Sequence, residues 1–261
     1  MIFSAFFRKF RNRALFLSLV WVLLFAVSML MLGLILDTFG KTAEVHSLVS
    51  LTWSGYVAAS DFSSPLPEVI GVNASWIVPS VSISSDNTYS SAWIGIGGQF
   101  DTSLIQIGTE HDSVNGKERY IAWYELLPDY AINIPIMISE GDMMSASINL
   151  VDKDTNLWFM QLTDVTTGES FSKSVNYNST LLTAEWIVER PTLNGQIANL
   201  SNFGSVTFTE AYVNINHEVL PLGEVSFSQT HLTDNQNTQL TTVSQINSDG
   251  KSFTIQYIAN G

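Results

Sequence analysis

The chain of 261 residues contains no cysteine. A disulfide framework is therefore excluded, and so are thiol nucleophiles and thiolate metal sites. A chain without disulfides must obtain its stability from a hydrophobic core. The roughly 224 residues that follow Asp37 are enough for one domain with a substantial core.

Basic residues are also scarce, with 11 Lys and Arg against 24 Asp and Glu and a net charge of −13. Phosphate binding needs clustered Lys and Arg, so we expect no nucleic-acid partner. With few bases, little positive charge accumulates when the carboxylates are protonated, which suits acidic surroundings. An ordinary acidic surface that keeps a protein soluble at neutral pH would have the same composition.

The longest uncharged apolar run lies near the amino terminus, at residues 14–36, directly after Arg8, Lys9, Arg11 and Arg13. As a helix this run would be roughly 34 Å long, enough to cross a bilayer core of about 30 Å. A cleaved signal peptide usually has a shorter apolar region and a small-residue cleavage site, and it remains the alternative. We therefore expect a cytoplasmic basic segment and transmembrane anchor at residues 1–37, a stalk at 38–51 and an extracellular domain at 52–261, which would be secreted if the leader is cleaved.

After residue 50 the apolar residues follow the two-residue period of strands. Met144, Ala146 and Ile148 alternate with polar residues, and Val206, Phe208 and Tyr212 would share one face of SVTFTEAYVNI. Clusters of Gly, Asn, Asp and Pro separate these segments, as expected for turns, and no long amphipathic helix competes with them. The sequence predicts an all-β sandwich or barrel.

Several well-known hydrolytic motifs are missing. The segment Asp101-Thr102-Ser103 lacks the glycine of an aspartic-protease loop, G-x-S-x-G does not occur, and no second histidine follows His217 at zincin spacing. The four histidines stand in polar, turn-like sequence, and we expect all of them to be solvated surface residues: His46, His111, His217 and His231. The sequence thus predicts no metal site and no cofactor.

Two strand-like segments instead supply a neutral amide and a carboxyl group. Gln106 lies in LIQIG and points opposite to its isoleucine neighbours, so it can face a cleft while they fill the core. Glu185 lies in TAEWIVERP and shares a face with Glu189. The alternation alone does not choose between these two acids.

These segments belong to a longer series whose order and spacing resemble the glutamic peptidases, or eqolisins. The resemblance runs from about residue 52 to 213, and more weakly to 257, through LTWSGYVA, ASWIVPSV, SAWIGIGG, LIQIG, AWYELLPDY, ISEGDMMSASI, TTGESFSKS, TAEWIVERP and FGSVTFTEA. It implies an antiparallel β-sandwich of the concanavalin or lectin type, with a cleft on one concave face.

The resemblance also implies roles for particular residues. The family's catalytic glutamine and glutamate correspond to Gln106 and Glu185, while Trp53, Trp93 and Glu125 would lie near them and contact substrate. From the residue pattern alone, the two tryptophans are equally compatible with core aromatics. Members of the family usually have an aspartate where this chain has Gly97, a departure that would change the acidity around the catalytic pair.

The implied function is that of an acid-acting endopeptidase with polypeptide substrates and no cofactor. Glu185 would activate a water molecule and Gln106 would stabilise the oxyanion. A membrane-tethered, lectin-like binding module without catalysis is the alternative, but the presence of both Gln106 and Glu185 argues against it. The sequence leaves the oligomeric state open.

Overall fold

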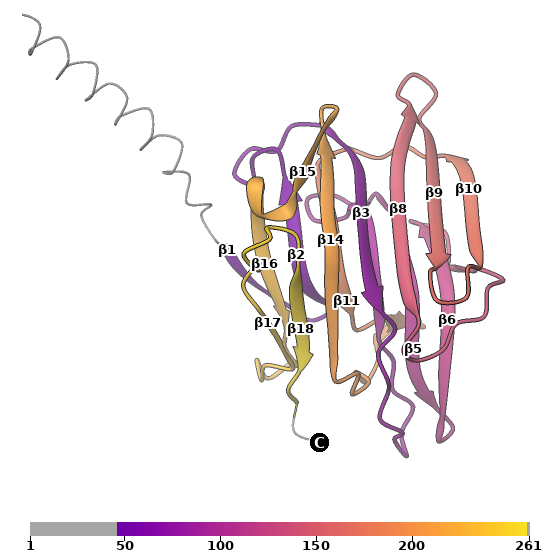
Figure 1. Cartoon of the computed structure of the whole chain (residues 1–261). Helices are drawn as coiled ribbons and strands as arrows, with labels where there is room; N and C mark the ends of the chain where they lie inside the picture. Colours follow the sequence, from indigo (N-terminus) through magenta and orange to yellow (C-terminus); the bar gives the residue numbers. More distant parts are fainter. Residues whose placement is uncertain (1–45, 260–261) are drawn as a thin grey trace, which may run out of the picture. The chain divides into compact units, whose positions relative to one another are not determined.

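The computed structural model describes residues 46–259, which form eighteen strands and one short 3-10 turn at Leu222–Glu224. Two large sheets lie face to face as a sandwich (Figure 1). Between residues 46 and 259 no helix is long and apolar enough to span a membrane. The apolar run at residues 14–36 lies outside the described residues, so the anchor stays a prediction.

Eight strands form the sheet that carries the candidate site, which we call sheet A. Their order is β1-β16-β2-β11-β4-β5-β6-β7. The β1–β16 pair is parallel and the other pairs are antiparallel. The bounds are β1 His46–Ser50, β2 Trp53–Ala59, β4 Ser91–Gly97, β5 Leu104–Val114, β6 Lys117–Leu126, β7 Ile132–Asn133, β11 Thr183–Glu189 and β16 Ser226–Leu232.

The second sheet, sheet B, has the order β10-β9-β8-β3-β14-β18-β17, and β15 pairs with β14. Its strands are β3 Val69–Ile77, β8 Met143–Asp152, β9 Leu157–Asp164, β10 Ser170–Asn176, β14 Ser205–Ile215, β15 Glu218–Pro221, β17 Thr241–Val243 and β18 Phe253–Tyr257. A small hairpin of β12 Thr192–Leu193 and β13 Gln196–Ile197 stands apart from both sheets. The predicted all-β antiparallel sandwich is confirmed for this part of the chain.

Residues 46–50, which the sequence analysis assigned to the stalk, form β1. They pair with β16 from His46↔Ser228 to Ser50↔Leu232. The segment has only one apolar pair, Leu48 and Val49, and Val49 is exposed. Its pairing with β16 therefore could not be read from hydrophobic alternation.

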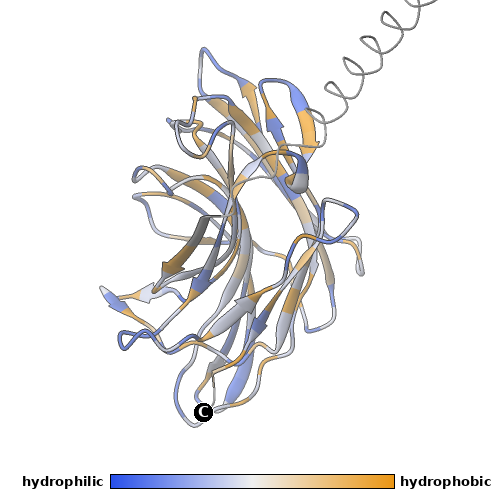
Figure 2. Cartoon of the chain, turned by 90° about the vertical axis from the view of Figure 1, so that its left-hand side faces the viewer, coloured by the Kyte–Doolittle hydropathy of each residue, from blue (hydrophilic) through white to orange (hydrophobic). Residues whose placement is uncertain are grey.

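The core between the sheets is built from large aromatic side chains. Trp186 and Tyr56 from sheet A and Trp76 and Phe208 from sheet B are all at most 1% exposed, and Tyr56 packs edge to face on Phe253 of sheet B with ring centroids 4.7 Å apart. Trp186 Nε1 donates to the carbonyl of Asn73 at 3.0 Å, and Trp76 Nε1 donates to Thr109 Oγ1 at 3.0 Å, so both bonds join the two sheets. Apolar and polar residues alternate along many strands (Figure 2), as expected when one face of each strand enters a shared core.

Two sequence predictions about this core are wrong. His111 is fully buried rather than solvated, because it points into the sandwich and bonds through Nε2 to Thr109 Oγ1 at 2.7 Å. Tyr212 does not share a face with Val206 and Phe208, because a β-bulge shifts the register of β14 between Thr209 and Tyr212. The burial of Met144, Ala146 and Ile148 is confirmed.

Candidate active site

Gln106 and Glu185 lie in one row across sheet A. In the register of the sheet, Gln106 on β5 is opposite Gly95 on β4, and Glu185 on β11 is opposite the same glycine from the other side. Directly opposite residues share a face, and adjacent strands are about 4.8 Å apart, so the two Cα atoms are about 10 Å apart. Their neighbours Ile105 and Trp186 are fully buried and face the inter-sheet core. The pair therefore occupies the outer face of sheet A.

Gly95 contributes no side chain between the two, and the Trp93 ring and a Leu104 methyl group pack closely over it. A Cβ atom at this position would come within 2.9 Å of both the Trp93 ring and a Leu104 methyl group. Those contacts are too close for any side chain without a shift of neighbours. The amide and the carboxyl group thus flank a position on the sheet from which no side chain rises.

Polar atoms without hydrogen-bond partners gather around this position. Glu185 is 0% exposed and Gln106 is 3% exposed. Among the residues that the structure describes, no hydrogen-bond partner is found for either carboxyl oxygen of Glu185, for Gln106 Oε1 or for the hydroxyl of Thr183. Buried polar groups are nearly always bonded, so an unpaired group of this kind is typical of a reactive or binding site.

Burial raises the pKa of Glu185 well above its usual value. The Thr183 hydroxyl and the backbone N–H of Gly97 lie near the carboxyl group without reaching hydrogen-bond geometry; they act in the opposite direction but are outweighed, and the negative charge of Asp101 adds to the rise. A carboxyl group in these surroundings holds a proton more firmly than one in water does. It is therefore suited to accept and return a proton within one reaction cycle.

Glu125 extends the row beyond Gln106, since the two residues are opposite each other on β6 and β5. Gln106 Nε2 donates to Glu125 Oε2 at 2.5 Å. Because a carboxylate only accepts hydrogen bonds, this contact turns the amide nitrogen toward Glu125 and leaves its second N–H for another acceptor. Burial raises the pKa of Glu125, and the bond from Gln106 opposes that rise.

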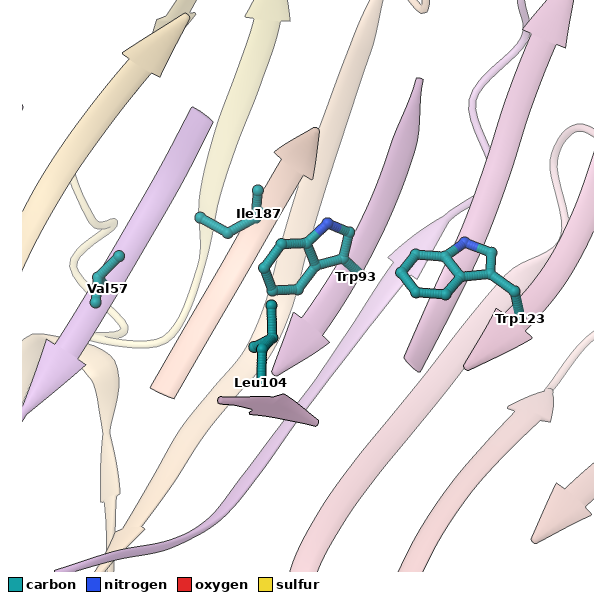
Figure 3. Close-up of a cluster of buried hydrophobic side chains, with 5 residues drawn as sticks. All are labelled: Val57, Trp93, Leu104, Trp123 and Ile187. Atoms are coloured by element: carbon teal, nitrogen blue, oxygen red, sulfur yellow. The ribbon is translucent and has the colours of Figure 1, made fainter. Parts of the chain in front are cut away.

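An apolar cluster surrounds the row on the same face. Figure 3 shows its five buried members on neighbouring strands: Val57, Trp93, Leu104, Trp123 and Ile187. Trp53, Phe62 and Leu127 are partly exposed and pack against it. The rings of Trp53 and Trp93 meet edge to face with centroids 5.1 Å apart. Of the two predicted tryptophans, Trp93 is thus a buried support, and Trp53 is partly exposed beside it.

Glu189 lies on the same face as Glu185 but in different surroundings. Its Oε2 accepts a 2.8 Å hydrogen bond from Trp93 Nε1, whereas Glu185 has unpaired oxygens. Burial raises the pKa of Glu189 to about 7, and the bond from Trp93 only partly offsets this effect. The structure therefore separates the two acids that alternation could not separate.

Three further residues of this face were not found by sequence reasoning. Thr183 precedes Glu185 by two positions, so strand periodicity could have placed its hydroxyl beside the carboxyl group. The Trp123 indole nitrogen is buried and unpaired among the described residues, two positions from Glu125. The role of Gly95 depends on the pairing of three strands, which no local pattern reveals.

Gly97 has a structural reason to be glycine. Its φ is +98°, and a Cβ atom would lie 2.3 Å from the carbonyl oxygen of Ser103. An aspartate could not occupy this position without moving the turn between β4 and β5. Between residues 46 and 259, no group of three or more acidic or histidine side chains is arranged to hold a metal ion.

Comparisons with known proteins agree with one another. The model of the peptidase A4 family matches residues 51–257. Aspergillopepsin-2 from Aspergillus niger is 32% identical over 202 residues, covering 68% of each chain. The crystal structure of scytalido-glutamic peptidase with a transition state analog inhibitor is 26% identical with a TM-score of 0.68, over 80% of this chain and 99% of that one. Aspergilloglutamic peptidase from Aspergillus niger is 29% identical with a TM-score of 0.59, over 66% of this chain and 99% of that one.

Proposed function

The chain belongs to the peptidase A4 family and is therefore a glutamic-type endopeptidase, and we propose that Glu185 and Gln106 are its catalytic pair. The resemblance noted in the sequence is thus confirmed, and polypeptides are the substrates. One observation carries the assignment of the pair. The unpaired carboxyl group of Glu185 and the amide of Gln106 flank Gly95, which places no side chain of its own between them.

In this proposal Glu185 acts first as a base and then as an acid. Its carboxylate takes a proton from a water molecule as the water oxygen bonds to the scissile carbonyl carbon. When the tetrahedral intermediate collapses and the C–N bond breaks, Glu185 returns the proton to the leaving amine. The carboxylate is regenerated, and no covalent bond to the enzyme is formed. A raised pKa suits this double role, because the group binds the proton well enough to carry it from one step to the next.

Gln106 stabilises the charge that develops on the carbonyl oxygen. One N–H of its amide is bonded to Glu125, and the other is free to donate to the oxyanion. A single donor of this kind is typically worth about 3–4 kcal/mol of activation free energy. Glu125 thereby acts as a positioning residue, and the partly exposed Trp53 offers an aromatic surface to the substrate chain.

The test is a pair of matched substitutions. Glu185→Gln keeps the shape of the side chain but removes the proton-transferring group, so kcat should fall by roughly two to four orders of magnitude. Glu189→Gln should have a much smaller effect, because Glu189 is hydrogen-bonded to Trp93. Digestion of a quenched fluorescent peptide measures both, with thermal unfolding as the check on folding. A folded Glu185→Gln protein with near-normal turnover would refute the assignment, and a greater loss in Glu189→Gln would identify the other acid.

We further propose that the protein is anchored in a membrane by residues 14–36, with the catalytic domain outside the cell. The length of the apolar run and the preceding basic residues support this topology. The full-length protein should stay with membranes after carbonate washing, and added protease should degrade its catalytic domain on intact cells. Recovery of the protein in the medium with a new amino terminus after residue 36 would replace the anchor by a cleaved signal peptide.

A further inference from the structure

Two loop segments that lead into the catalytic strands are hydrogen-bonded to each other. The first connects β4 to β5 and precedes Gln106, and the second connects β10 to β11 and precedes Glu185. Thr180 Oγ1 donates to Asp101 Oδ2 at 2.5 Å, and the Thr180 N–H donates to Ser103 Oγ at 3.4 Å. The Leu104 N–H donates to the hydroxyl of Tyr177 at 2.7 Å. The positions of Gln106 and Glu185 are thus connected by contacts outside the sheet itself.

Asp101 is the centre of this link. Its Oδ1 accepts both the N–H and the hydroxyl of Ser103, each at 2.6 Å, while its Oδ2 accepts the hydroxyl of Thr180. Partial burial tends to raise the pKa of Asp101, but the hydrogen bonds from Ser103 and Thr180 outweigh it and hold the pKa below its usual value. Asp101 therefore keeps its negative charge further into acid than an ordinary aspartate.

The charge of Asp101 also acts on Glu185. The other ionisable groups of this face are Glu189, which interacts with Glu125 and Glu110, and Glu110 itself, which interacts with Asp112 and Arg119. The negative charge of Asp101 contributes to the raised pKa of Glu185. Tyr177, the remaining titratable group of the link, is neutral at acidic and neutral pH, and burial raises its pKa further.

We propose that Asp101 is a positioning residue for the catalytic pair: its carboxylate accepts hydrogen bonds from Ser103 and Thr180 and so joins the β4–β5 loop to the segment before β11. This role rests on the proposed function of Glu185. Asp101 does not touch the reacting atoms. Asp101 affects the position of Glu185 through the hydrogen bonds between the loops, and it affects the pKa of Glu185 through its charge.

Two substitutions in the full-length protein distinguish the effect of the Asp101 charge from the effect of the hydrogen bonds between the two loop segments. Asp101→Asn removes the negative charge, which should lower the pKa of Glu185. In the profile of kcat/KM against pH, the limb on which Glu185 ionises should therefore move to lower pH by about half a unit. Thr180→Val keeps the charge and removes one donor, so kcat should fall severalfold while that limb stays in place. A ¹³C NMR titration of the Glu185 side-chain carboxyl should show the same shift in Asp101→Asn without depending on turnover.

Asp249 provides a matched control. It accepts the N–H groups of Lys251 and Ser252 and the hydroxyl of Ser252 at 2.6 Å, so its local bonding resembles that of Asp101, but it lies in the turn before β18. Asp249→Asn should change neither the limb nor kcat. The proposal is overturned if the Asp101→Asn profile and titration superimpose on those of the parent, or if Asp249→Asn shifts them equally.

The outcomes for Asp101 and for the catalytic pair remain distinguishable. An active Glu185→Gln protein would refute the proposed function whatever Asp101 does. An inactive Glu185→Gln protein together with an unshifted Asp101→Asn protein would overturn the role of Asp101 alone. If Asp101→Asn does not fold, Thr180→Val decides: an unchanged kcat would overturn the positioning role, and a lower kcat with an unshifted limb would support it.

Discussion

At the scale of single residues, the site depends on which polar atoms are paired and which are not. Glu185 and Glu189 stand four positions apart on one strand, and both are removed from water to a large extent, yet only Glu189 has a hydrogen bond from an indole. Alternation along β11 predicted that the two acids share a face. It could not predict their difference, because the donor to Glu189 is Trp93, which lies on the neighbouring strand nearly a hundred residues earlier.

The orientation of the Gln106 amide gives a prediction at this scale. In Glu125→Gln the acceptor becomes a neutral amide that can both donate and accept, so it no longer fixes which end of Gln106 faces the substrate. We expect kcat to fall about tenfold or more with little change in KM, because the oxyanion contact is made in the transition state. Steady-state kinetics on a single peptide would measure this effect.

Glu118→Gln is the control for Glu125→Gln, since Glu118 is an exposed acid on the same strand. It should leave both kinetic constants unchanged. A rise in KM with an unchanged kcat in Glu125→Gln would mean that Glu125 binds substrate directly instead of orienting Gln106.

At the scale of strands, most elements were predictable from alternation and turn residues, and the exceptions have identifiable causes. The bulge in β14 places Glu210 at a φ of 50° and moves Tyr212 to the other face, which a strict two-residue period cannot express. His111 was assigned to the surface from its polar neighbours, although it shares the inward face of β5 with Ile107 and Thr109. Pairing between distant strands, which created the row through Gly95, has no local signature at all.

Gly95 gives a prediction at the scale of the strand. Gly95→Ala would force its methyl group against the Trp93 ring and Leu104, and it would place a side chain between the catalytic groups. Overpacking of this kind typically costs about 1–3 kcal/mol of unfolding free energy. We expect kcat/KM to fall by at least about a hundredfold, more than the loss of stability alone would explain at a temperature where the variant is folded.

Gly116→Ala serves as the comparison for Gly95→Ala. Gly116 lies in a turn with a φ of +70°, and a Cβ atom there would meet nothing within 4 Å. Alanine should cost about 1 kcal/mol of stability at such a position without changing kcat/KM. Full activity in Gly95→Ala would show that the position above Gly95 is not where the reaction occurs.

At the scale of the whole molecule, buried ionisable groups set the dependence of stability on pH. Burial raises the pKa of both Glu110 and Glu189 to about 7 and that of Glu185 well above its usual value, so the folded protein binds protons between about pH 4.5 and 7 that the unfolded chain releases. Stability must then increase as the pH falls through this range. His111 acts in the opposite direction, because burial lowers its pKa to about 3 and the unfolded chain takes up its proton below about pH 6.5.

Taken together, these pKa shifts predict that the free energy of unfolding is greatest near pH 4.5. Between pH 7 and 4.5 the carboxyl groups with raised pKa outnumber His111. Below pH 4.5 His111 and the aspartates whose pKa is lowered by hydrogen bonds, such as Asp101, both favour the unfolded chain, so stability should decline again. Thermal unfolding measured from pH 3 to 8 would show this curve. His111→Gln keeps an acceptor for Thr109 and should flatten the decline below pH 4.5, whereas exposed His217→Gln should not. A stability that rises steadily from pH 4.5 to 7 would contradict the assignment of these buried acids.

The central position of β11, β4 and β5 in sheet A has a consequence for how a polypeptide can be recognised. The main-chain donors and acceptors of these strands are already used in pairing with their neighbours, so a substrate cannot join them by β-augmentation, as peptides do at an open sheet edge. Its backbone must find partners in the loops that rise above the face, such as those carrying Phe62 and Phe100, whose rings meet at 5.3 Å. Cleavage preference and cleavage chemistry are thereby encoded in separate parts of the chain. Loops exchanged between relatives should transfer the preference for particular peptide sequences and leave the row through Gly95 intact.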